Sequence, residues 1–251
     1  MFEPFTSARA LTEAAQAFLI HLQMAEQQYF DRYPGMQLPD QRDEEGWVRV
    51  RYSFSYPIPI SLAVLVFQVV QNLRSALDHA AFDASRELGG NPRPKFTKFP
   101  FGKTKKDLDR DLLRKKSEVP EQMRRFFAKF RPYQRGNRDL WALNELRNSK
   151  IHKTLAIMST MSNGFSLNEG VTDFAVFRPQ SKWNAQKREL LVMKYMVGQH
   201  TNIEGNFSVA ISLGADTPFK GQPAVATLAR LTQTVADIVS EIETHTATLK
   251  T

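Results

Sequence analysis

Three stretches of the sequence carry apolar residues at the three- and four-residue spacing of an amphipathic helix. The first covers residues 8–32, the second and longest covers 61–88, and the third covers 222–249. Tyr-Pro-Gly follows the first stretch and Gly-Gly-Asn-Pro follows the second, and both sequences are typical helix stops. Because each stretch has one broad apolar face, we expect the three helices to pack together in a bundle.

The second helix also has a polar edge opposite its apolar face. Polar residues on this edge include Asn72, Arg74, Asp78 and His79. A polar edge on so apolar a helix indicates that other parts of the chain cover both of its sides. Arg74 and Asp78 are four residues apart, which is the spacing of an ion pair on one helix.

A change to two-residue alternation predicts strands in two parts of the chain. Residues 47–55 alternate Val, Tyr and Phe with Arg and Ser, as in a half-buried strand. Three further alternating segments, separated by polar and Gly-containing turns, predict an antiparallel sheet over 161–215. We therefore expect one compact α+β domain, in which a helical bundle over 1–160 is completed by 222–249 and the sheet is inserted between them.

The segment Asp139–Leu155 has polar residues where helical periodicity predicts buried ones. On a helix over this range the apolar residues form one wide arc that contains Asn144, Arg147 and Asn148, with His152 at its edge. The residues predicted to point the other way are Ala142, Ser149, Lys153 and Ala156. Burying an amide or a guanidinium without partners costs several kcal/mol. These side chains therefore either form a satisfied inter-helix network or face a cleft or a second subunit.

Positive charge is concentrated in one segment of the chain. Residues 93–138 hold 16 Lys or Arg and five Asp or Glu, a balance of +11 in a chain of formal charge +8. Two short basic helices are predicted there, over 105–116 and 120–130. This excess indicates an anionic partner such as nucleic acid, although a solvated helix surface gives the same pattern. The residues predicted to hold an RNA backbone are Lys115, Lys116, Arg124, Arg125 and Lys129.

The composition excludes several kinds of site. The chain has no cysteine, which rules out disulfides, thiolate nucleophiles and thiolate zinc sites. Its five histidines lack the short spacing of a metal-binding helix face, so we expect no metal and no cofactor. No uninterrupted apolar run reaches the roughly 18 residues of a membrane span, and the first residues do not follow the signal-peptide pattern. We therefore expect a cytoplasmic protein without membrane contact.

The residues Arg147-Asn148-Ser149-Lys150-Ile151-His152 resemble the Arg-polar-x3-His signature of HEPN domains. HEPN domains (higher eukaryotes and prokaryotes nucleotide-binding) are helical bundles, and many are metal-independent ribonucleases. The resemblance implies that Arg147 and His152 are a catalytic pair supported by Asn148, and that a homodimer completes the site. The sequence LRSALDH and the Lys-His segment also resemble a widespread group of uncharacterised bacterial proteins. The HEPN resemblance does not extend to the predicted sheet.

Helix geometry adds a condition to this interpretation. An ideal helix separates Arg147 from His152 by about 140°, so the two converge only if the helix bends or ends, or if a second subunit contributes. If the predicted helix over 61–88 packs against the helix over Asp139–Leu155, it brings further polar groups to the same site. The residues predicted to support the site are Asn72, Arg74, Asp78, His79 and Asn144.

These residues suit phosphodiester chemistry without a metal. A histidine can exchange a proton with a 2′-hydroxyl or a 5′-oxygen near neutral pH, and an arginine can stabilise the charge of the phosphorane. We therefore expect a HEPN-like RNA-binding protein or metal-independent endoribonuclease. One alternative is a non-catalytic interaction or nucleic-acid-binding module in which Arg147 and His152 only join helices. Another is a small-ligand or nucleotide pocket lined by Asn144, Asn148 and His79.

Overall fold

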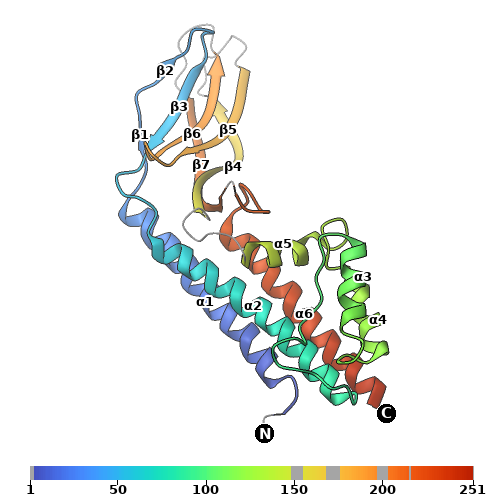
Figure 1. Ribbon diagram of the computed structural model, residues 1–251. Coiled ribbons are helices and arrows are strands. Elements are labelled where there is room, and N and C mark those ends of the chain that lie inside the picture. Colours follow the sequence, from blue (N-terminus) through green and yellow to red (C-terminus); the bar gives the residue numbers. More distant parts are fainter. Residues whose placement is uncertain (1–2, 148–154, 168–175, 197–202, 215, 251) are drawn as a thin grey trace.

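The protein is a long helical bundle with a region of β-strands at one end (Figure 1). A computed structural model describes residues 3–147, 155–167, 176–196, 203–214 and 216–250. The predicted α+β class, a helical bundle with an antiparallel sheet, is confirmed. Both ends of the chain lie at the end of the bundle that is far from the strands (Figure 1).

Three long helices form the bundle: α1 (Thr6–Arg32), α2 (Ile60–Glu87) and α6 (Ala224–Lys250). Their bounds agree with the predicted stretches to within two residues. Helix α2 packs against both α1 and α6. Leu73 of α2 and Val235 of α6 are fully buried in the shared core. Removal of these apolar faces from water is the main force that holds the bundle together.

Helix α2 is also long and apolar enough to cross a membrane, judged by length and composition alone. Polar residues interrupt every apolar run of α2, but they are too few to make the helix fail this test. The core helix of a soluble protein passes the same test, and half of the most apolar window of α2 is buried inside the protein. The cytoplasmic location therefore stays a prediction.

Three shorter helices lie beside the bundle: α3 (Lys105–Arg114), α4 (Glu121–Lys129) and α5 (Arg138–Arg147). Helices α3 and α4 are the two short basic helices that the sequence predicts. A capping box starts α3, because Thr104 and Asp107 bond each other's backbone amides and so satisfy free N–H groups of the first turn. Figure 1 shows α3 and α4 together on one side of the bundle.

The prediction of one helix over Asp139–Leu155 is wrong at its C-terminal end. Helix α5 is assigned only as far as Arg147, and Leu155 already lies in strand β4 (Leu155–Leu167). Strand β4 pairs with β7, nearly 50 residues further along the chain, and periodicity within one segment cannot show such a partner. Asn148 and His152 lie outside the described residues.

Ala142 is also placed differently from its prediction. It is fully buried, as are Leu140 and Leu143 on the same helix. Helix α5 packs against both α2 and α6, so two of its sides are covered instead of one. The predicted arc of buried positions on this helix is therefore wrong in leaving out Ala142.

In the residues that the structure describes, the strands form two antiparallel sheets, one of five strands and one of two. The larger sheet contains β1 (Met36–Gln37), β2 (Gln41–Arg42), β3 (Val48–Ser53), β5 (Val176–Asn184) and β6 (Glu189–Met196), and the smaller one contains β4 and β7 (Ile203–Leu213). The predicted strand near 47–55 is confirmed as β3. It belongs to the larger sheet, because β3 pairs along its length with β6.

The main core continues from the bundle into the strands. Leu190 and Leu213 are fully buried in the same cluster as the apolar residues of α1, α2 and α6. A carboxylate of α1 also joins the two parts, since Glu26 Oε1 accepts a hydrogen bond of 2.5 Å from Ile211 N of β7. Burial raises the pKa of Glu26 above its ordinary value, and the hydrogen bond from Ile211 opposes that rise. The strands are therefore anchored to α1 by apolar and polar contacts.

Candidate functional site

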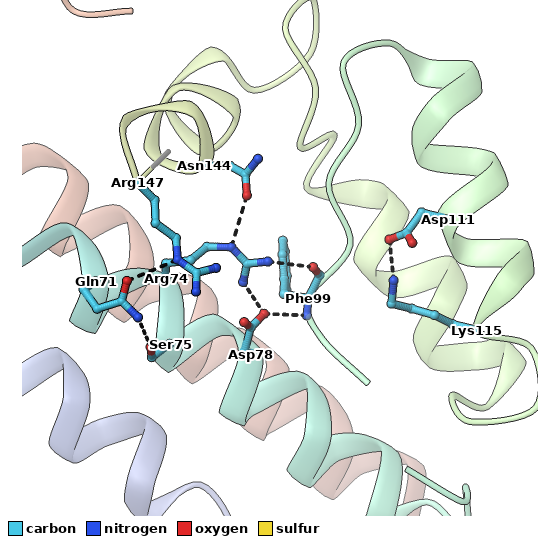
Figure 2. Close-up of polar contacts among 9 residues, drawn as sticks. All are labelled: Gln71, Arg74, Ser75, Asp78, Phe99, Asp111, Lys115, Asn144 and Arg147. Atoms are coloured by element: carbon cyan, nitrogen blue, oxygen red, sulfur yellow. Dashed lines mark hydrogen bonds and ion pairs between the residues drawn. The ribbon is translucent and has the colours of Figure 1, made fainter. Parts of the chain in front are cut away.

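Arg74 lies at the centre of a polar network that joins α2, α5 and the loop before α3 (Figure 2). Its guanidinium forms an ion pair with Asp78, and its Nε donates to Asn144 Oδ1 at 3.3 Å. The same guanidinium reaches the carbonyl of Phe99 at 3.5 Å and lies 4.3 Å from the centre of the Phe101 ring. Asp78 also accepts a hydrogen bond of 3.0 Å from Phe99 N. The predicted ion pair between Arg74 and Asp78 is therefore confirmed.

Arg74 at the centre of this network is shielded from solvent, whereas Asp78 and Asn144 are partly buried. Only 6% of Arg74 is exposed, and burial lowers the pKa of its guanidinium, an effect that Asp78 opposes. An arginine stays charged even when buried, so it needs the partners that surround it here. Arg74, Asp78 and Asn144 are thus engaged with one another, and in these contacts they hold helices together.

Arg147 lies on the last turn of α5 in a more open environment. Its side chain is half-buried, and its Nε donates to Gln71 Oε1 of α2 at 3.1 Å (Figure 2). Gln71 in turn donates to Ser75 Oγ at 3.5 Å. In the part of the chain that the structure describes, Arg147 has no acidic partner. Within the described ranges its two terminal amino groups form no hydrogen bond.

A cavity of about 420 Å³ lies beside Arg147. Its walls come from α1, α2, α5 and the loop before α3, and include Ser7, Asp78, His79, Phe82, Lys98 and Arg147. A volume of this size falls within the range of small-molecule sites. The cavity therefore gathers two of the predicted support residues, Asp78 and His79, around Arg147.

The charge available inside this cavity is positive. Asp78 forms an ion pair with Arg74, and Asp83 forms one with Arg86 at 3.2 Å. Lys98 and Arg147, by contrast, form no ion pair with any residue in the described ranges. Two carboxylates are thus neutralised by neighbours while two cations are not, and the cavity favours an anion.

His79 brings a second kind of chemistry to the cavity. Its Nδ1 lies 2.9 Å from Ser7 Oγ, in the first turn of α1. This contact uses one ring nitrogen and leaves Nε2 for another partner. The sequence predicted His79 as a support residue but gave no signal for Ser7, because the contact depends on how α1 crosses α2.

Asn72 is not brought to the cavity. Its amide donates to the carbonyl of Gln68 on the same helix at 2.9 Å. Asn72 was predicted to approach α5, whereas the α2 residues that bond α5 are Gln71 and Arg74. Gln71 was missed because the predicted polar edge of α2 did not include it.

Two residues of the predicted RNA-binding set are largely occupied. Lys115 pairs with Asp111 at 2.5 Å, and only 11% of its side chain is exposed (Figure 2). Arg124 donates from Nε to the carbonyl of Val119 at 3.2 Å. Lys115 therefore contributes little to an external surface.

The other three residues of this set are exposed. Arg125 pairs with Glu121 at 2.5 Å, but 78% of its side chain faces solvent. Lys116 and Lys129 are exposed, and the described part of the chain offers neither of them an ion pair. Exposed pairs such as the one between Arg125 and Glu121 are weak, so an anionic ligand could compete for Arg125.

No family model matches the sequence, and neither a curated protein nor a solved structure matches it. The HEPN resemblance therefore stays a prediction that rests on the motif from Arg147 to His152. Within the described ranges, no three His, Asp or Glu side chains are placed to hold a metal ion together.

Proposed function

We propose that this chain is a HEPN-like RNA-binding protein that acts as a metal-independent endoribonuclease, and that RNA enters the cavity beside Arg147. One observation carries the proposal. Arg147 and Lys98 line an open cavity of about 420 Å³, and the described residues give neither of them an acidic partner. A phosphodiester would supply the missing negative charge, and a guanidinium binds two phosphate oxygens at once.

His79, which lines the cavity, is the residue that would transfer protons in this reaction. His79 Nε2 takes the proton of the RNA 2′-hydroxyl, and the 2′-oxygen then attacks the phosphorus. The bond to the 5′-oxygen breaks, that oxygen takes a proton from water, and His79 returns its proton to the hydroxide that is left. The products are a 2′,3′-cyclic phosphate and a 5′-hydroxyl end. Arg147 stabilises the charge that builds on the phosphorus oxygens. His152, the histidine of the motif, is the other candidate for the proton transfer.

Cleavage of a single-stranded RNA in the presence of EDTA tests this proposal. We expect the wild-type protein to produce cyclic phosphate ends, and Arg147→Ala to cleave about 100-fold or more slowly. Arg138→Ala is the matched control, because Arg138 is an exposed arginine on the same helix α5 that does not line the cavity. His79→Ala and His152→Ala then identify the acid–base residue.

The outcomes separate the two parts of the proposal. RNA binding that weakens in Arg147→Ala, without any cleavage by the wild-type protein, would support the binding function and contradict the nuclease. A wild-type protein that neither binds nor cleaves RNA would contradict both.

A mononucleotide is a second candidate occupant of the same cavity. The volume is large enough for one, and Phe82 is a half-buried aromatic residue that lines the same cavity as the two cations. In that case AMP should raise the melting temperature of the wild-type protein but not that of Arg147→Ala. The purely structural alternative fits Arg74, Asp78 and Asn144 better than Arg147, because those three bond one another around the buried guanidinium of Arg74.

A homodimer is part of the proposal, because the HEPN resemblance implies that a second subunit completes the site. Sedimentation equilibrium measures this directly. Large apolar side chains are exposed on α1 and α2, among them Ile20, Met24, Ile60 and Val64. These are the first residues to substitute if the protein sediments as a dimer.

A further inference from the structure

A groove separate from the Arg147 cavity lies between α3 and α4. It consists of two adjoining hollows of about 560 and 280 Å³, which share Asp109, Arg125 and Ala128 as lining residues. None of its lining residues belongs to the cavity beside Arg147. The groove is therefore a second candidate binding site.

One end of the groove is strongly basic. The charged residues around the larger hollow are Lys105, Asp109, Arg125, Lys129 and Arg131. Four cations thus face one carboxylate, and Glu121 pairs with only one of the four, Arg125. Such a concentration of positive charge attracts a ligand that carries several negative charges at short intervals.

The other end of the groove adds apolar side chains. The smaller hollow is lined by Leu112, Leu113 and Ala128 together with the charged residues Asp109, Glu121, Arg124 and Arg125. Leu113 is 61% exposed, which is a high value for a leucine in a helix that buries Leu108 and Leu112. This end therefore offers a surface for a flat apolar group such as a nucleobase.

We propose that the groove between α3 and α4 binds single-stranded RNA, with phosphates at the basic end and bases against Leu113. This inference rests on the proposed function and adds the strandedness of the substrate. A single strand exposes phosphates and bases together, which matches a groove that has an excess of cations at one end and an exposed leucine, Leu113, at the other. A duplex hides its bases inside the helix, and hollows of this size are too small to admit it.

Neutralising the basic end gives the first test. We expect Lys105→Gln with Lys129→Gln to weaken binding of a labelled single-stranded RNA about 25-fold at about 0.1 M salt, measured by fluorescence anisotropy. The slope of log affinity against log salt should fall by about 1.4, because two phosphate contacts are lost. The control is Lys182→Gln with Lys187→Gln, which removes two exposed lysines from the region of strands β5 and β6.

A second variant tests whether Leu113 contacts the bases. Leu113→Ser should weaken binding about fivefold and leave the salt slope unchanged, because it removes apolar contact but no charge. Met36→Ser is the control, since Met36 is a comparably exposed apolar residue on strand β1 that lines neither hollow of the groove. A duplex of the same sequence should bind more weakly than the single strand.

Several results would overturn this proposal. Unchanged affinity and salt slope in the Lys105 and Lys129 variant, together with lost activity in Arg147→Ala, would reject the groove and keep the proposed function. Equal binding of duplex and single strand would also reject it. An acidic, leucine-containing peptide that binds more tightly than RNA and depends on the two lysines would make the groove a protein-docking surface. A wild-type protein that binds no RNA would reject both proposals.

Discussion

Arg74 and Arg147 lie close together between α2 and α5, yet their environments are opposite (Figure 2). Arg74 is almost completely buried, and Asp78, Asn144 and the Phe99 carbonyl take up its donors. Arg147 is half-buried, has one hydrogen bond to Gln71 and lines a cavity. A buried charge is tolerated only with a full set of partners, whereas a half-buried one can keep donors for a ligand. The comparison separates a structural arginine from a candidate binding arginine.

The largest difference between the two arginines should appear in the free energy of unfolding of their alanine variants. We expect Arg74→Ala to lower the free energy of unfolding by about 3 kcal/mol, because it removes a buried side chain and leaves the partly buried Asp78 without its cation. Arg147→Ala removes one partly buried hydrogen bond and should cost only about 0.5–1.5 kcal/mol. Urea unfolding followed by circular dichroism measures both. Equal losses would show that the two arginines have the same structural role.

A smaller effect should follow from giving Arg147 an acidic partner. Gln71→Glu places a carboxylate where Gln71 Oε1 now accepts from Arg147, so Arg147 would resemble Arg74. The new ion pair should compete with phosphate and weaken RNA binding about tenfold without loss of stability. Gln68→Glu, on the same helix, controls for the added negative charge. RNA affinity that falls equally in both variants would argue against a direct role for Arg147.

The smallest effect concerns the loop that forms one wall of the cavity. Glu118 holds this loop, because its Oε2 accepts a hydrogen bond of 2.5 Å from Thr97 Oγ and its Oε1 pairs with Arg93. Burial acts to raise the pKa of Glu118, but the bonds from Thr97 and Arg93 outweigh it and lower the pKa below its ordinary value of 4.5. Its contribution to stability is therefore present above pH 4.5 and is lost as the pH falls through the lowered value.

Glu118→Gln should for this reason make stability less sensitive to acid. Urea midpoints measured at a series of acidic pH values would show a shallower decline for Glu118→Gln than for the wild-type protein. Glu121→Gln is the control, because Glu121 forms an exposed ion pair that contributes little. If the urea midpoints of wild type and Glu118→Gln decline equally as the pH falls, another carboxylate is responsible for the acid sensitivity.

The sequence predicted those features that depend on neighbouring residues of one helix. The bounds of α1, α2 and α6 follow from apolar residues that recur over many turns. The ion pair between Arg74 and Asp78 follows from their four-residue spacing. The apolar pattern alone is enough to locate these elements, because most of their stability comes from burying one face.

Features that join distant parts of the chain could not be predicted in this way. The end of α5 was misplaced because the strand that follows it is defined by its partner β7. The contacts of Arg147 with Gln71 and of His79 with Ser7 each join residues more than 70 positions apart. Such contacts depend on the angles at which the helices cross, and the periodicity of a single helix does not specify those angles.

The position of α6 also affects how the chain folds during its synthesis. The apolar faces of α1 and α2 are made first, but the third helix of their bundle begins only at Ala224. A ribosome-bound chain must therefore carry a partly uncovered pair of helices, α1 and α2, until α6 has been made. Premature termination before α6 would leave that hairpin permanently exposed and prone to aggregation, so this protein should depend strongly on chaperones that act on nascent chains.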